Sequence, residues 1–221
     1  MKLAIVGTHS DTRALAPFDD PEYEIWVFNE ACTLKVVGTD GIALPWVKRC
    51  NAVFQMHTPA VYRSPENRSD KDHWAWLQQP HGLKIYMQNV DPAVPDSVAY
   101  PLEQISRRLL GGFLVADRHV KLFTSTVAYA LALGIYEALN LRFDEIHVWG
   151  VEMASETEYL MQREGVMFWV GIALGHAIPV YFHSGENIWK QPLYGYESDI
   201  EQHAPEYIER RDRYSDEIKV L

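Results

Sequence analysis

Residues 120–159 constrain the fold more than any other part of this chain. Residues 120–123 form a short β-rich run, residues 127–139 show a helical pattern, and residues 145–151 form a second β-rich run. The helical pattern is apolar on nearly all sides, so we expect this helix to be buried. A strand, a buried helix and a strand in close succession predict a βαβ unit, and therefore a parallel sheet.

Other apolar runs of strand length extend this sheet. We expect buried strands at residues 2–6, 23–28, 51–56, 84–87 and 179–182. The proline-rich segment 88–101 is expected to be irregular. The sequence thus predicts an α/β fold, Rossmann-like and doubly wound, with a mainly parallel sheet of about six strands.

The length favours one domain. A chain of 221 residues is long enough for a full α/β core, and it shows no repeat or linker. We predict a single domain over residues 1–221, with a polar tail from about residue 184. The longest apolar run, residues 166–182, is interrupted by glycine, histidine and proline, so no membrane span is expected and a cytoplasmic location is predicted.

The charge and the cysteines exclude several classes of function. The net charge of −10 argues against general nucleic-acid binding. A small phosphorylated ligand remains compatible, because local backbone amides can hold it. Cys32 and Cys50 are too few for a disulfide scaffold or a thiolate metal site, and no spacing of other ligands indicates a metal. The aromatic content leaves room for a homodimer without specifying one.

Polar residues follow the predicted strands, and they form the candidate site. Ligands of open parallel sheets bind beyond the carboxyl ends of the strands. The residues there offer backbone amides, hydroxyls, an imidazole and a side-chain amide, which suit a nucleotide. The candidates for nucleotide binding are Gly7, Thr8, His9, Ser10, Asn29, Ser125, Thr126 and Gly150.

Three further residues are candidates for catalysis. His57 follows the third strand, and an imidazole titrates near neutrality, as a general base should. Glu152 follows the strand after the buried helix and offers a carboxylate. Arg163 could offset charge that develops on a leaving phosphate.

The helix expected at residues 158–173 supplies candidates for substrate contact. At helical spacing Glu158 shares a face with Gln162, and Tyr159 shares a face with Arg163. A guanidinium beside a tyrosine suits capture of a phosphate or carboxylate. We therefore expect Glu158, Tyr159 and Gln162 to contact the substrate.

Several stretches resemble a known family. The motifs EIWVFN (24–29), NAVFQMH (51–57) and STVAYALALGIYEALNLRFDEIHVWGVEM (125–153) are similar to those of bacterial CMP-sialic-acid-dependent sialyltransferases. Rossmann-like relatives of that family include archaeal 6-hydroxymethylpterin pyrophosphokinase and uncharacterised phage proteins. The resemblance runs over residues 2–182 at the level of motifs. It implies that Gly7 and Ser10 belong to a loop that contacts the phosphate and that Asn29 contacts the nucleoside. It also implies that Ser125 or Thr126 is the small hydroxyl residue before the buried helix, and that Trp149 to Glu152 form a turn.

These observations favour one function and leave two alternatives open. The first is a nucleotide-binding transferase, glycosyltransferase-like, with a nucleotide or nucleotide-sugar as substrate and no certain cofactor. The second is a protein that binds or sequesters a nucleotide without turnover. The third is a nucleotide hydrolase or N-glycosidase, in which Glu152 or Glu158 would supply the nucleophile.

Overall fold

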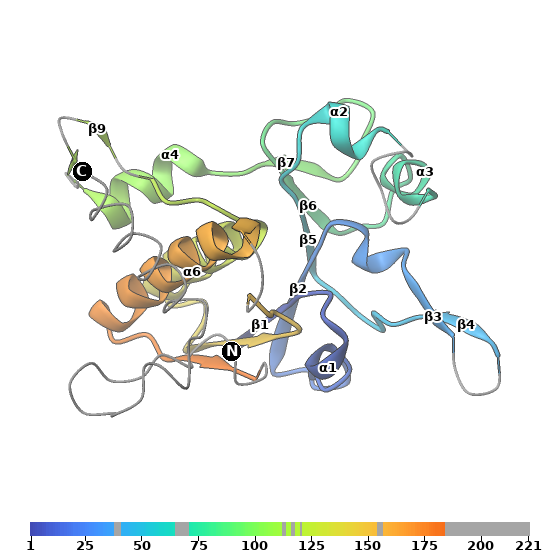
Figure 1. The fold of residues 1–221 in the computed structure, drawn as a ribbon, viewed down its shortest axis with the longest axis horizontal. Helices are drawn as coiled ribbons and strands as arrows, with labels where there is room; N and C mark the ends of the chain where they lie inside the picture. Colours follow the sequence, from blue (N-terminus) through green and yellow to red (C-terminus); the bar gives the residue numbers. More distant parts are fainter. Residues whose placement is uncertain are drawn as a thin grey trace, which may run out of the picture. The chain divides into compact units, whose positions relative to one another are not determined.

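A parallel sheet of seven strands runs through the described part of the chain (Figure 1). The computed structural model describes residues 1–37, 41–64, 71–111, 114–115, 118–119, 121–153 and 157–183. The order in space is β11-β10-β1-β2-β5-β6-β7, and each neighbouring pair is parallel. The strands are β1 (Lys2–Val6), β2 (Tyr23–Phe28), β5 (Ala52–Gln55), β6 (Lys84–Met87), β7 (Ser97–Ala99), β10 (Glu145–Trp149) and β11 (Val180–Phe182). The predicted Rossmann-like α/β class is confirmed.

Two long helices and several short ones connect the strands. The long helices, α5 and α6, pack against each other. The helices are α1 (Ser10–Arg13), the 3-10 helix η1 (Asn29–Cys32), α2 (Pro59–Tyr62), α3 (His73–Leu77), α4 (Leu102–Ile105), the π-helix η3 (Ser106–Leu110), α5 (Thr126–Leu139) and α6 (Thr157–Gly175). Two antiparallel hairpins lie outside the sheet: β3 (Lys35–Val37) with β4 (Ala43–Pro45), and β8 (Leu114–Val115) with β9 (Arg118–His119).

Helix α5 is buried on the sheet, as its apolar sequence predicts. Gly134 lets it approach closely. A Cβ atom on Gly134 would lie 2.7 Å from Leu3 Cδ2 and 3.3 Å from Ile146 Cδ1. The helix therefore rests on β1 and β10 at Leu3 and Ile146, and this contact helps to fix where its amino terminus lies.

The other face of the sheet carries a separate apolar core. Alternate residues of the strands, such as Val6, Val27 and Val53, pack there against Tyr62 and Leu77 from the short helices. Successive side chains of a strand point to opposite faces, so each buried strand serves both cores. The strands consequently read as continuous apolar runs, which is typical of parallel sheets covered on both sides.

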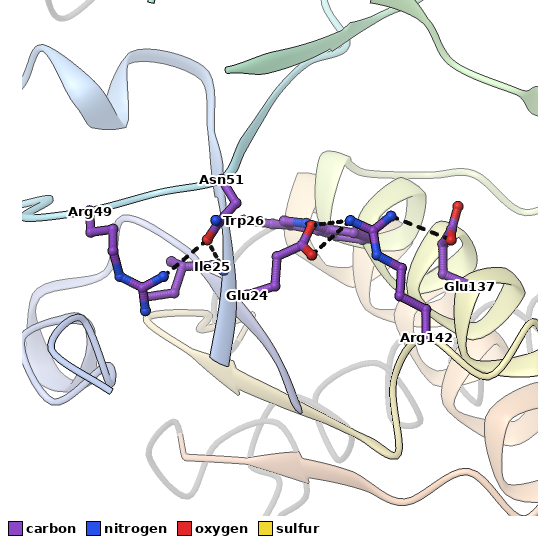
Figure 2. A network of polar contacts seen from close by, with 7 residues as sticks. All are labelled: Glu24, Ile25, Trp26, Arg49, Asn51, Glu137 and Arg142. Carbon is purple, nitrogen blue, oxygen red and sulfur yellow. Dashed lines mark hydrogen bonds and ion pairs between the residues drawn. The ribbon is translucent and has the colours of Figure 1, made fainter. Parts of the chain in front are cut away.

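An arginine ties the end of α5 to strand β2 (Figure 2). Arg142 Nη2 donates to both Glu24 carboxylate oxygens, at 2.8 and 2.7 Å. Its Nη1 lies 3.4 Å from Glu137 Oε2, on α5 itself. Glu24 also accepts from the Trp26 indole at 2.8 Å. The half-buried carboxylate thus has a charge partner and a neutral donor.

A second cluster in the same view joins β2 to the start of β5. Asn51 Oδ1 accepts from the Ile25 amide at 2.8 Å and from Arg49 Nη1 at 3.3 Å. Arg49 also donates to the backbone carbonyls of Phe18, Asp20 and Tyr23. These contacts hold the amino-terminal end of β2, which is the end opposite the carboxyl termini of the strands.

The predicted strand at residues 120–123 is wrong for the described residues 121–123. Leu122 adopts a positive φ of 36°, which is incompatible with an extended strand. Its carbonyl accepts the Trp169 indole N–H at 3.1 Å. Gly165 of α6 packs against the same carbonyl, since a Cβ there would lie 2.8 Å from it. The segment is therefore held on α6 and not in the sheet.

The last strand of the sheet before α5 in the chain is β7 (Ser97–Ala99). It lies within the proline-rich segment 88–101, which was expected to be irregular. It pairs with β6, and just beyond it the Tyr100 amide donates to the Met87 carbonyl at 2.8 Å. The sheet accordingly has seven strands where about six were expected. Pro92, Pro95 and Pro101 flank β7 without entering it, so no proline interrupts its ladder.

The described residues belong to one compact unit, Met1–Gly185. The predicted polar tail from about residue 184 lies outside the described residues, so the single domain over residues 1–221 stays a prediction. None of the helices described is both long and apolar enough to cross a membrane.

Candidate functional site

The strand order defines where a ligand site is expected. From β1 the chain first adds β2, β5, β6 and β7 on one side, and then adds β10 and β11 on the other. The direction of winding reverses between β1 and β10, so the crevice outside their carboxyl ends is the topological switch point. This crevice lies beyond Val6 and Trp149.

A cavity of about 490 Å³ opens at this point. Its volume falls in the range of small-molecule and cofactor sites. Most of the candidate residues from the sequence line it, namely Gly7, Thr8, His9, Asn29, His57, Ser125, Thr126, Gly150, Glu152 and Gln162. The structure therefore brings together residues that are up to about 150 positions apart in the chain.

Two of the remaining candidates are described by the structure and do not line the cavity. Ser10 is the first residue of α1 and does not line the cavity. Arg163 does not line it either, because it lies roughly 100° around the helix from Gln162, which does. The side chains of Glu158 and Tyr159 lie outside the described residues, so their expected contact with substrate stays a prediction.

Sequence reasoning missed the apolar and aromatic part of the wall. The rings of Phe123 and Tyr129 lie 4.8 Å apart, and both line the cavity. Phe123 comes from the segment wrongly expected to be a strand, so its position could not be predicted. The other lining residues that were not among the candidates are Phe28, Met56, Thr124, Val127, Val151 and Met153. Met56 follows β5 directly and Val151 lies two residues after β10, and these positions could have identified them.

The loops after β1 and β10 pack backbone against backbone. The Gly7 amide donates to the Trp149 carbonyl at 2.8 Å, and the His9 amide donates to the Gly150 carbonyl at 2.9 Å. Gly150 has a φ of +60°, and a Cβ on it would lie 2.5 Å from the Gly7 carbonyl oxygen. Both glycines are thus required by this close approach. The Gly7 and His9 amides therefore donate to backbone carbonyls within the protein, and their contact with a nucleotide stays a prediction.

The amino terminus of α5 offers donors instead. Ser125 is its N-cap, and Ser125 Oγ accepts from the Ala128 amide at 3.2 Å. Within the part of the chain that the structure describes, the amides of Thr126 and Val127 make no hydrogen bond. The first turn carries no acidic residue. Free amides and the positive end of the helix dipole therefore lie at the cavity wall, and both favour an anion.

Asn29 is a partly buried polar residue that lines the cavity. Its backbone has a φ of +48°, a left-handed conformation that non-glycine residues adopt rarely. Its Oδ1 atom is buried, and among the described residues no donor reaches it. A buried acceptor without a donor is costly, and strained backbone concentrates at functional sites. A ligand N–H or O–H group would satisfy this atom.

His9 and Glu152 form a polar pair on another part of the wall. His9 Nε2 lies 2.6 Å from Glu152 Oε2. The loop that carries Glu152 is held by the Thr12 hydroxyl, which accepts from the Gly150 amide at 2.8 Å. A carboxylate fixed in this way could accept hydrogen bonds from sugar hydroxyls.

A second cavity of about 160 Å³ shares His57 with the first. It lies between the residues that follow β5 and those that follow β6, and its lining includes Arg63, Gln88 and Asn89. Sequence reasoning found none of these three. Their common feature is that they follow neighbouring strands, as the predicted site residues do.

A buried aspartate anchors the second cavity. Asp91 Oδ2 accepts from Arg63 Nη2 at 2.7 Å and from the Tyr62 hydroxyl at 2.6 Å. Burial acts to raise the pKa of Asp91, but these hydrogen bonds outweigh it and hold the pKa below its ordinary value. Burial, together with the hydrogen bond to Asp91, raises the pKa of Tyr62 to about 12. The guanidinium of Arg63 is thereby fixed at the cavity wall.

Comparison with known proteins gives one structural similarity. No protein-family model matches the chain, and no curated protein matches it. The chain is similar to a solved structure of the sialyltransferase CstII from Campylobacter jejuni, in complex with a substrate analogue, cytidine-5′-monophosphate. The two share 12% sequence identity, the similarity covers 93% of this chain and 98% of that chain, and the TM-score is 0.43.

The likeness to pterin pyrophosphokinases and phage proteins stays a prediction. So do the cytoplasmic location, the homodimer and the absence of nucleic-acid binding.

Proposed function

We propose that this protein is a transferase that moves a glycosyl group from a nucleotide-sugar donor to an acceptor hydroxyl. One observation carries the proposal: His57 stands on the wall shared by two cavities. A protein that only binds a nucleotide needs the larger cavity alone. A transferase needs two sites with a general base between them.

The donor would occupy the larger cavity. Asn29 Oδ1 would accept a hydrogen bond from the base or the ribose, and Glu152 could accept from sugar hydroxyls. The phosphate would face the amino terminus of α5, near Ser125 and Thr126. The described lining contains no lysine or arginine, so the positive field comes from the helix and is modest. A donor with a single phosphate therefore fits better than a diphosphate.

The acceptor would occupy the smaller cavity. A volume of about 160 Å³ is below that of a drug-sized ligand and suits a single sugar ring. The acceptor oxygen would transfer its proton to His57 and form a bond to the anomeric carbon of the donor. The bond from that carbon to the phosphate oxygen would break, and the nucleotide would leave with the electron pair. The end of α5 would stabilise the charge on the leaving phosphate.

A thermal-shift titration tests the donor site. A nucleoside monophosphate at about a hundredfold its Kd should stabilise the protein by about 2.7 kcal/mol, which raises Tm by roughly 5–10 °C at this chain length. Asn29→Ala should weaken this binding about three- to tenfold, the value of one neutral hydrogen bond. Asn89→Ala, in the second cavity, is the matched control and should leave nucleotide affinity unchanged. Equal losses for both variants would contradict the donor assignment.

Product analysis separates the proposed reaction from its alternatives. With a nucleotide-sugar and a mixture of sugar acceptors, transfer should release free nucleotide and form a glycosylated acceptor, and His57→Ala should abolish both. If His57→Ala leaves the fate of the ligand unchanged, the protein only binds or sequesters the nucleotide. Release of free base would instead indicate an N-glycosidase.

A further inference from the structure

His57 is connected to the protein interior by a chain of side-chain contacts. Its Nδ1 atom lies 3.0 Å from Gln55 Oε1. The other end of the same amide, Gln55 Nε2, lies 2.6 Å from His73 Nε2. Gln55 and His73 are both fully buried, with exposed fractions of 0%. The amide of Gln55 therefore bridges a histidine at the cavity wall and a histidine in the core.

The position of Gln55 is unusual for its strand. It ends β5, and it faces the same side of the sheet as Val53, where the surrounding core is apolar. Burying an amide costs free energy unless both its oxygen and its nitrogen are hydrogen-bonded. The two histidines meet this requirement, one at each end.

The orientation of the Gln55 amide, with its nitrogen toward His73 and its oxygen toward His57, determines the protonation of both rings. An amide nitrogen can only donate, and an amide oxygen can only accept. With the amide in this orientation His73 Nε2 accepts, so the His73 proton is on Nδ1, which is a buried atom. His57 Nδ1 must donate, so it carries the proton, and the lone pair of the neutral ring is on His57 Nε2.

We infer that Gln55 and His73 are positioning residues that hold His57 in the Nδ1–H tautomer, with Nε2 as its basic nitrogen. The hydrogen bond at one ring nitrogen decides which nitrogen is protonated and also orients the ring. The use of Nε2 as a general base rests on the proposed function. The tautomer itself does not, and it can be measured without any substrate.

Nitrogen NMR of ¹⁵N-histidine-labelled protein tests the tautomer, at about pH 8.5, where unperturbed imidazole is neutral. His57→Asn assigns the His57 signals. His81 is an internal control, because its Nε2 lies 2.7 Å from the Trp76 carbonyl oxygen and must donate to it. The expected spectrum contains His57 as Nδ1–H and His81 as Nε2–H. A spectrum in which His57 is Nε2–H overturns the inference.

Two substitutions of Gln55 test its part. Gln55→Glu keeps an acceptor for His57 and should preserve the Nδ1–H tautomer, whereas Gln55→Met removes the acceptor and should give a mixture. An unchanged tautomer in Gln55→Met overturns the role of Gln55. If that variant does not fold, the wild-type and Gln55→Glu spectra still decide, since Nε2–H in either contradicts the inference.

Kinetics give a second measurement once a donor and an acceptor are found. A general base typically contributes about 10²–10⁴ to the rate. Replacing a residue that only orients this base should have a smaller effect, a loss of about ten- to a hundredfold in kcat with KM nearly unchanged. Gln55→Glu should recover part of this loss. A nucleotide screen without hits would end the proposed function but leave the tautomer result intact, so the two failures are distinguishable.

Discussion

At the scale of single residues, the glycines and the buried polar side chains carry the most information. Gly7 and Gly150 were candidates from the sequence, and the structure gives them a packing role: each leaves room for the backbone of the other. Asn29 and Gln55 are different, because each costs stability where it stands unless a partner satisfies it. Gln55 finds its partners within the protein, and Asn29 Oδ1 finds none among the described residues.

Replacing Gly150 by alanine should cost more stability than replacing Gly82. Both glycines have a left-handed backbone, but only Gly82 has free space around an added Cβ atom. Gly150→Ala combines a left-handed backbone with a contact of 2.5 Å to the Gly7 carbonyl, and we expect a loss of about 2–4 kcal/mol in the free energy of unfolding. Gly82 has a φ of +67° and nothing within 4 Å of an added Cβ, so Gly82→Ala should lose about 1–2 kcal/mol. Urea denaturation measures both, and equal losses would refute the close-packing explanation.

At the scale of elements, the two ends of α5 have different roles: one end lines the cavity and the other is bonded to the sheet. Its amino terminus lines the larger cavity, and the residues just after its carboxyl terminus bond to β2 through Arg142 (Figure 2). Between these ends, Gly134 sets the distance of the helix from β1 and β10. The direction of the helix dipole toward the cavity is thus fixed by contacts far from the cavity itself.

Arg142→Ala should destabilise the protein without weakening a ligand in the cavity. Removal of the guanidinium leaves the half-buried Glu24 without its charge partner, which should cost about 1–3 kcal/mol. Lys121→Ala breaks an exposed pair with Glu103 and should cost less than about 1 kcal/mol. Urea denaturation gives the stabilities, and calorimetric titration gives the Kd. A large change of Kd in Arg142→Ala would show that this network reaches the site.

At the scale of the whole molecule, the sheet ends in a cluster of aromatic and ionisable rings at β10 and β11. His147 Nδ1 lies 2.9 Å from His183 Nε2, and the rings of Trp149 and His183 stack at 4.2 Å. Burial lowers the pKa of both histidines, and for His183 the neighbouring His147 adds to the effect. Glu145 opposes the shift at His147, while the charge of Lys2 reinforces it.

The global stability should therefore fall as the pH falls below about 6.5. In that range these histidines bind protons in the unfolded chain, whereas their lowered pKa values keep them neutral in the folded chain. Protonation therefore favours unfolding. Urea midpoints should drop between about pH 7.5 and about pH 5.5, and His147→Phe should flatten the change. His176→Gln is the control, because His176 is exposed after α6. An equal slope in wild type and His147→Phe would contradict this account.

The sequence by itself determined the elements and the end of the sheet where the site lies. Continuous apolar runs identified β1, β2, β5, β6, β10 and β11, and the all-round apolar pattern identified α5 as buried. These features are local, since burial on both faces is visible in a few consecutive residues. Parallel strands bring their carboxyl ends to one edge, and this rule gathered Asn29, His57 and Glu152 at one cavity, whereas Ser125 reaches it from the start of α5.

Only the tertiary structure decided which groups remain available to a ligand. Residues 121–123 avoid the sheet because the Leu122 carbonyl bonds to Trp169, 47 positions later in the chain. The Gly7 amide is occupied by Trp149, and His57 is oriented through Gln55 by His73. Each of these outcomes depends on hydrogen bonds between distant segments. Local patterns of hydrophobicity carry no information about such partners, because burial sets where a polar group lies but not which group satisfies it.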